Sequence, residues 1–246
     1  VLYNLKFFNM EQGSSVAAIK LGSDMVEHFV IGTGIIKSSE TEAKTGRILA
    51  VRDMGLNGDD CTNQRHFRLT NVGRLSGSVG GLGALPYGMF VASANAFVHV
   101  FAMKDVLPSA KRTITEKSRP GSAVPAQNHS WTEAIVEEAQ EAEENDGFKL
   151  LDTWGGGFVS QTVVTDGTKV LVGDLYKSVV LLEFDLEHLE LTVKARDFSA
   201  MSVRPIGTIS TREFIAADSE FNLFTVQYRN DPTSPRPHIQ PDRAYD

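Results

Sequence analysis

The sequence has little of what disulfide-stabilised, metal-binding or membrane proteins need. Its 246 residues include a single cysteine, Cys61, so no disulfide can form within the chain. Such sparing use of cysteine is typical of a reducing compartment, and we expect a nuclear or cytosolic protein. The apolar runs are all much shorter than the roughly 20 residues that a membrane-spanning helix requires. We therefore expect no membrane partner.

Catalytic motifs are also missing. The six histidines are scattered, and none lies in an HExxH motif or at metal-ligand spacing from a cysteine. His99 lies in the apolar run FVHVF and is predicted to be a strand residue rather than a ligand. The glycine-rich stretches at residues 80–83 and 155–157 lack the Lys-Ser/Thr of a phosphate loop, and no serine has a G-x-S-x-G context. We predict a protein that is not an enzyme, with no catalytic residues, no cofactor and no metal site.

The chain lacks an excess of basic residues. Lysine and arginine number 24 against 31 aspartates and glutamates, for a formal net charge of −7. A surface that contacts nucleic acid mainly through phosphates needs clustered positive charge. The charge argues against direct contact between this segment and nucleic acid.

What the chain does have is a recurring unit. An apolar run ends in a small residue, a tight polar turn follows, and a second apolar run returns. The copies read FVIGTGI at residues 29–35, MFVASANAFVHVF at 89–101, KVLVGDLYKSVVLLEF at 169–184 and EFIAADSEFNLFTVQ at 213–227. Each copy is predicted to be a β-hairpin, and a repeat of this kind indicates stacked copies of one unit.

The apolar runs indicate sheets that are covered on both faces. VLV and VVLLEF are apolar without alternation, as in strands whose side chains are buried on either side. A parallel α/β sheet would need helical crossovers, but the connections show almost no period of 3.6 residues. A propeller buries both faces of small antiparallel sheets without helices. The sequence therefore predicts an all-β fold, a partial β-propeller of four-stranded antiparallel blades similar to WD40 blades.

One blade can be predicted strand by strand, at residues 159–165, 169–173, 178–184 and 189–195. The next blade begins near Met201 and continues through residues 213–217 and 222–228. The third and fourth repeats start 44 residues apart, at 169 and 213, which fits the roughly 40 to 50 residues of a blade. The second and third start 80 residues apart, at 89 and 169, so an insertion is expected between them.

The insertion covers residues 106–147. Its first part is rich in proline, serine, lysine and arginine and is predicted to be disordered. Its second part opens with Ser130 and Glu133, the spacing of a capping box, and predicts one acidic helix. The segment from Ser130 to Gly147 carries seven acidic side chains and no basic one. We favour a solvated helix in a long loop, with a docking element for a basic partner as the alternative.

The resulting domain map has propeller blades at residues 1–105 and 148–229, the insertion at 106–147, and a disordered tail at 230–246. The chain starts in a strand-like pattern, LYNLKFF, and its proline-rich tail lacks strand character. About three and a half blades are predicted, fewer than the four of the smallest closed propellers. Because an open set of blades leaves strand edges unpaired, we expect a piece of a longer protein.

Several motifs together resemble the carboxyl-terminal part of the damaged-DNA-binding protein 1 family. They are GDL-x-K-S-V-x-LL at residues 173–182, ARDF at 195–198, FNLF at 221–224 and HFVIGTGIIKSSETEAKTGRILAV at 28–51. The resemblance extends from about residue 29 to 228, without the insertion. The large subunits of the cleavage and polyadenylation factor and of splicing factor 3b share the architecture. ARDF followed by FNLF favours the damage-binding branch.

The resemblance implies a scaffold of three propellers, of which this chain is most of the third. It implies a non-enzymatic adaptor of a cullin-4 ubiquitin ligase in DNA repair, nuclear and also cytoplasmic. WD40-type substrate receptors push a helical segment into a cleft between propellers, while cullin-4 binds a part of the protein outside this chain. The alternative is an RNA-processing scaffold of the same family.

Carried over by position, the resemblance assigns partner binding to Leu175, Lys177 and Arg196. Lys177 stands where an arginine is more common. The alternatives are solvated turn charges for the two cations and packing within the blade for Leu175. Two features depart from the family pattern: the Trp expected shortly before Met201 is missing, and the insertion is not typical. Receptor choice is expected to differ accordingly.

Overall fold

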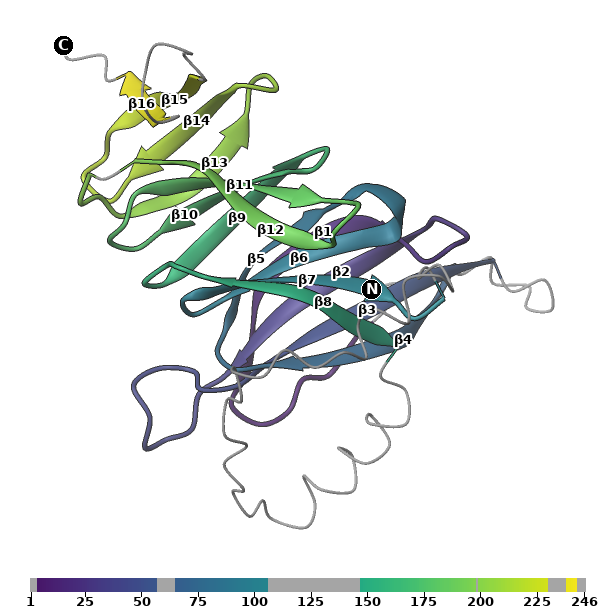
Figure 1. Cartoon of the computed structure of the whole chain (residues 1–246). Coiled ribbons are helices and arrows are strands. Elements are labelled where there is room, and N and C mark those ends of the chain that lie inside the picture. The colour runs from purple at the N-terminus through teal and green to yellow at the C-terminus, as the bar shows by residue number, and fades with distance from the viewer. Residues whose placement is uncertain (1–3, 57–64, 106–146, 198, 230–237, 243–246) are drawn as a thin grey trace, which may run out of the picture.

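The computed structural model describes residues 4–56, 65–105, 147–197, 199–229 and 238–242. These residues form four antiparallel sheets of four strands, and each sheet is a meander in chain order. Figure 1 shows the four sheets, here called blades 1 to 4, following one another in an open stack. The predicted all-β fold of four-stranded antiparallel blades is confirmed. The part of the chain described here contains no helix with the length and apolarity that a bilayer crossing requires.

The strand boundaries follow the repeat. Blade 1 comprises β1 (Glu11–Leu21), β2 (Val26–Ile35), β3 (Gly46–Leu56) and β4 (Arg65–Leu75). Blade 2 comprises β5 (Val79–Ala84), the 3-10 turn η1 (Pro86–Gly88), β6 (Met89–Ala94), β7 (Phe97–Met103) and β8 (Phe148–Gly155). Blade 3 comprises β9 (Ser160–Asp166), β10 (Lys169–Asp174), β11 (Val179–Asp185) and β12 (Glu190–Arg196). Blade 4 comprises β13 (Val203–Thr208), β14 (Glu213–Asp218), β15 (Leu223–Arg229) and β16 (His238–Asp242).

The insertion lies within blade 2. It joins β7 to β8, which pair from Phe97↔Gly155 to Met103↔Phe148. A hairpin tolerates a long connection because the entropic cost of closing a loop grows only logarithmically with its length. The predicted disorder and acidic helix of the insertion lie outside the described residues.

Two expectations at the ends of the chain were wrong. Residues 4–8, part of the strand-like LYNLKFF, form no strand, and β1 starts only at Glu11. The tail is not without strand structure, because His238–Asp242 form β16 and pair antiparallel with β15. Pro241 is tolerated there because β16 is an edge strand of its sheet, where a missing backbone N–H costs least. With β1 and β16 the structure has four sheets rather than three and a half.

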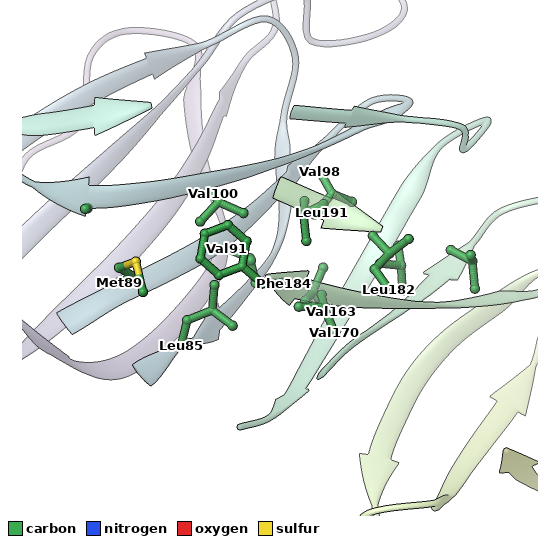
Figure 2. Packing of buried hydrophobic residues seen from close by; sticks show 13 residues of the cluster. Leu85, Met89, Val91, Val98, Val100, Val163, Val170, Leu182, Phe184 and Leu191 are labelled. Atoms are coloured by element: carbon green, nitrogen blue, oxygen red, sulfur yellow. The ribbon is translucent and has the colours of Figure 1, made fainter. Parts of the chain in front are cut away.

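Three apolar clusters fill the spaces between successive blades, and alternate residues of the middle strands supply different clusters. In β6, Phe90 packs toward blade 1 and Val91 toward blade 3. Figure 2 shows Val91, Val98 and Phe184 meeting between blades 2 and 3. In β10, Val170 joins that cluster, whereas Leu171 packs toward blade 4. Burial on both faces explains the unbroken apolar runs of the sequence.

The first strands of the four blades, β1, β5, β9 and β13, lie next to one another. Glycine permits the closest approach: a Cβ on Gly81 would lie 2.5 Å from the backbone nitrogen of Val163 in β9. Because strand directions alternate, the turns between second and third strands and the links between blades lie at one end of the stack. We call these segments the rim. They are residues 36–45, 76–78, 95–96, 156–159, 175–178, 197–202 and 219–222, of which 198 is not described.

Candidate functional site

Asp174 joins two segments of the rim. It ends β10 and is 2% exposed. Its Oδ1 accepts hydrogen bonds from the backbone N–H groups of Tyr176 and Lys177, both at 3.0 Å. Its Oδ2 accepts one from the N–H of Phe158, at 2.7 Å, in the link between blades 2 and 3. A buried carboxylate with three backbone donors holds the turn at 175–178 firmly against that link.

The link between blades 3 and 4 is tied to the same turn. Ser178 is buried, and its hydroxyl donates to Oδ2 of Asp197 at 2.6 Å. The Ser178 N–H donates to the carbonyl of Met201 at 3.0 Å, and Oδ1 of Asp197 accepts the N–H of Ser199 at 3.1 Å. Three successive rim segments therefore form one hydrogen-bonded unit. A partner would meet a surface whose backbone is already fixed.

The structure brings two of the predicted site residues together. Lys177 Nζ donates to the carbonyls of Gly156 and Gly157, at 3.1 and 3.3 Å. Arg196 Nη2 donates to the carbonyl of Gly156 at 2.7 Å, and its guanidinium lies 5.8 Å from the centre of the Trp154 ring. Both cations therefore support the link between blades 2 and 3, so they have a structural task whether or not they bind a partner.

The third predicted residue, Leu175, lies between two surface hollows. Its backbone N–H donates to the carbonyl of Val159 at 2.9 Å, and its side chain is partly buried. The first hollow spans blades 1 to 3 and is mainly apolar; it is lined by Ile36, Ala43, Val159 and Leu175, among others. We call it the apolar hollow.

The second hollow lies between blades 3 and 4. It is lined by Leu175, Tyr176, residues 199–202, Asp218, Ser219 and Glu220. We call it the acidic hollow, because both ionisable carboxylates come from the turn after β14. The two hollows share Leu175, so they adjoin on the rim.

Sequence reasoning missed the exposed aromatic side chains of the rim. Phe158 and Tyr176 meet edge to face with ring centres 5.1 Å apart, although they are 53% and 61% exposed. Phe221 is fully exposed and has a φ of 68°, an uncommon conformation for a bulky residue. The available signal was an aromatic residue at the tip of a predicted polar turn, where exposed apolar area often marks an interaction surface.

The scattered histidines form no centre that the structure can show. Within the described ranges, no group of three or more His, Cys, Asp and Glu side chains is placed to hold a metal. His99 is a residue of β7, as predicted, and lies 6.1 Å, between ring centres, from both Phe97 and Phe101. Burial lowers the pKa of its imidazole.

Comparison with known proteins finds likeness to one group. The model of the CPSF A subunit region matches residues 155–237, which include the whole three-segment unit around Asp174. DNA damage-binding protein 1 of Solanum lycopersicum is 23% identical over 220 residues, which cover 88% of this chain and 16% of that protein. DNA damage-binding protein 1b of Arabidopsis thaliana is 32% identical over 76 residues, 31% of this chain and 7% of that protein. DNA damage-binding protein 1 of Oryza sativa subsp. japonica is 33% identical over 67 residues, 27% of this chain and 6% of that protein.

The chain thus spans about a sixth of the length of the tomato protein. The likeness agrees with the motifs around Gly173 and Ala195, both of which lie inside the matched region. The comparisons confirm the predicted resemblance: the chain is similar to DNA damage-binding protein 1 and to the CPSF A subunit region.

Proposed function

We propose that this chain is a non-enzymatic scaffold segment whose rim docks other proteins, within an adaptor of a cullin-4 ubiquitin ligase that acts in DNA repair. WD40-type substrate receptors are the partners of the rim, and cullin-4 binds elsewhere in the protein. The observation that carries the proposal is the three-segment unit around Asp174, which fixes Leu175 between two hollows. That unit lies within the residues that match the family model.

The apolar hollow suits the apolar face of a helix. Its walls come from three blades, so its shape does not depend on one mobile loop. Its volume is about 310 Å³, enough for a few side chains rather than a folded domain. A helix that places its apolar side chains in a groove makes a contact of this kind.

The three predicted partner residues take different parts in this proposal. Leu175 contacts the partner directly, because its side chain reaches both hollows. Lys177 is exposed and can meet the partner while it holds the carbonyls of Gly156 and Gly157. Arg196 is a positioning residue, since it acts through the carbonyl of Gly156.

The proposal places the protein in the nucleus, where repair takes place, and also in the cytoplasm. Direct contact between this segment and nucleic acid is not part of it, because the formal net charge is −7. The alternative function is a scaffold for RNA processing. The match to the CPSF A subunit region favours that alternative, since it covers blade 3 and most of blade 4.

The test uses the full-length protein with Leu175→Asp, recovered from cells with its partners for quantitative mass spectrometry. A charged side chain in the apolar hollow is expected to reduce recovery of WD40-type receptors by roughly tenfold and to leave cullin-4 recovery unchanged. Val193→Asp is the matched control, because Val193 is 52% exposed on β12, outside the rim. Recovery of polyadenylation or splicing subunits without cullin-4 would replace the proposal with the alternative.

A further inference from the structure

We infer that the partner segment of the rim carries an arginine or lysine next to its apolar anchor, and that this basic side chain enters the acidic hollow between blades 3 and 4. The inference rests on the proposed docking function and adds the chemistry of the partner. It commits to a peptide segment that is apolar toward blades 1 to 3 and basic toward blade 4.

The lining of the acidic hollow gives it one sign of charge. Asp218 and Glu220 are its only ionisable acids, and the described lining residues include no lysine, arginine or histidine. Leu175 and Met201 give it an apolar part. A volume of about 380 Å³ accommodates one long side chain and its neighbours. A cation with an aliphatic stem, as in arginine or lysine, complements both parts.

The carboxylate of Asp218 is fixed in place by its own turn. Oδ1 accepts the N–H groups of Glu220 and Asn222, and Oδ2 accepts Nδ2 of Asn222, all at 2.9 Å. These donors are neutral, so they orient the negative charge without cancelling it. Glu220 lies two residues farther along, is exposed, and forms no ion pair within the described residues.

The nearby cations do not neutralise the hollow. Lys177 and Arg196 belong to the same blade, but both side chains donate to the carbonyl of Gly156 in the link between blades 2 and 3. Neither residue lines the acidic hollow. The negative charge of the hollow is therefore available to a partner.

Tyr176 favours arginine over lysine. Its ring lines the hollow, is 61% exposed, and is supported edge-on by Phe158. A planar guanidinium can stack on an aromatic face and direct its fork of donors to carboxylates, whereas an ammonium acts as a point charge. The two hollows meet at Leu175, so we place the basic residue about one helical turn from the apolar anchor.

The test selects peptides without assuming a partner. A phage-displayed library of helical peptides with randomised surface positions is selected on the immobilised full-length protein, and bound clones are sequenced. The expected result is enrichment, by roughly threefold or more over the unselected library, of arginine or lysine three or four residues from a large apolar residue. Clones of this class should bind the Glu220→Lys variant about tenfold more weakly and the Tyr176→Ala variant more weakly than the unchanged protein.

Glu27→Lys is the matched control, because it makes the same change of charge on β2, at an exposed position outside the rim. It should leave binding unchanged. Absence of enrichment, enrichment of acidic peptides, or equal binding to the Glu220→Lys variant would each overturn the inference. If Leu175→Asp still removes the cellular partners, only the charge assignment fails. If Leu175→Asp removes none of them, the docking function itself fails.

Discussion

Lys177 and Arg196 share one acceptor, the carbonyl oxygen of Gly156, at 3.1 and 2.7 Å. The two residues come from the start of β11 and the end of β12, and the acceptor belongs to the preceding inter-blade link. Charges that a resemblance assigns to partner binding are therefore also part of the rim's internal support. Substitutions at these positions should change the shape of the rim as well as its charge.

Arg196→Met should loosen the link between blades 2 and 3. Methionine keeps most of the side-chain length but removes the charged donor to Gly156, which is expected to cost about 1 to 2 kcal/mol of local stability. Lys177→Met should cost less, because its ammonium is exposed to water. Hydrogen exchange of the amides at residues 156–159 in the full-length protein measures both. Equal protection in the Arg196→Met variant and the unchanged protein would show that the link does not depend on this hydrogen bond.

Asp174→Ala should disrupt the rim more than any single change of its cations. It leaves the N–H groups of Phe158, Tyr176 and Lys177 without their acceptor, for an expected cost of about 2 to 4 kcal/mol. Asp174→Asn should cost less, because one amide oxygen still serves part of the set. Thermal unfolding followed by scanning calorimetry tests the order.

The matched control for this order is Asp185→Ala. Asp185 accepts the N–H groups of Glu187 and His188 in an exposed turn and bridges no second segment. Its removal should shift the unfolding temperature far less than Asp174→Ala. A larger shift for Asp185→Ala would show that bridging by Asp174 does not stabilise the blade.

The strands of blade 3 could be predicted within two residues because their apolar runs are unbroken and their turns carry aspartate, glycine or serine. Strand β1 was missed because it opens with the polar stretch Gln-Gly-Ser-Ser, which looks like a loop. Strand β16 was missed because Pro241 argues against a strand, and the register that admits it depends on β15. Both failures concern strands at an end of the stack, where packing requires less apolar sequence.

The candidate site was only partly readable. Leu175 was identified from a resemblance, and the structure places it between the two hollows. The hub role of Asp174 was not apparent, because it depends on Phe158 arriving from a different blade link. The edge-to-face pair of Phe158 and Tyr176 has the same origin. Contacts between segments are set by the stacking of blades, which a single sequence does not encode as a local pattern.

Gly81→Ala should separate the first strands of blades 2 and 3. The added methyl group would lie 2.5 Å from the backbone nitrogen of Val163, and a backbone atom cannot turn aside as a side chain can. Overpacking of this kind costs about 1 to 3 kcal/mol. Gly207→Ala is the matched control, since its methyl group would meet only the Cγ2 atom of Ile215, at 3.1 Å. Calorimetry should show a lower unfolding temperature for Gly81→Ala alone, and equal values would contradict the close approach of β5 and β9.

Blade 1 contains a buried ion pair that should make its stability depend on pH. Glu11 accepts hydrogen bonds from Arg47 Nε at 2.8 Å, from the Thr33 hydroxyl, and from the N–H of Phe8 at 2.9 Å. Burial alone would raise the pKa of the Glu11 carboxyl, but these donors outweigh burial and lower its pKa below the ordinary value. The guanidinium of Arg47 also lies over the Phe8 ring, 3.7 Å from its centre.

A carboxylate whose pKa is lowered by folding contributes stability above its unfolded pKa of about 4.3 and loses it as pH falls through the folded value. Hydrogen-exchange protection factors of β1 to β3 should therefore be constant from about pH 7 to 5 and fall below about pH 4. Glu11→Gln should lower protection by about 3 kcal/mol at pH 7, because it leaves Arg47 buried without its charge partner, and should remove the acid dependence. Glu27→Gln, at an exposed position of β2, should change neither. An unchanged acid dependence in Glu11→Gln would assign it to other carboxyl groups.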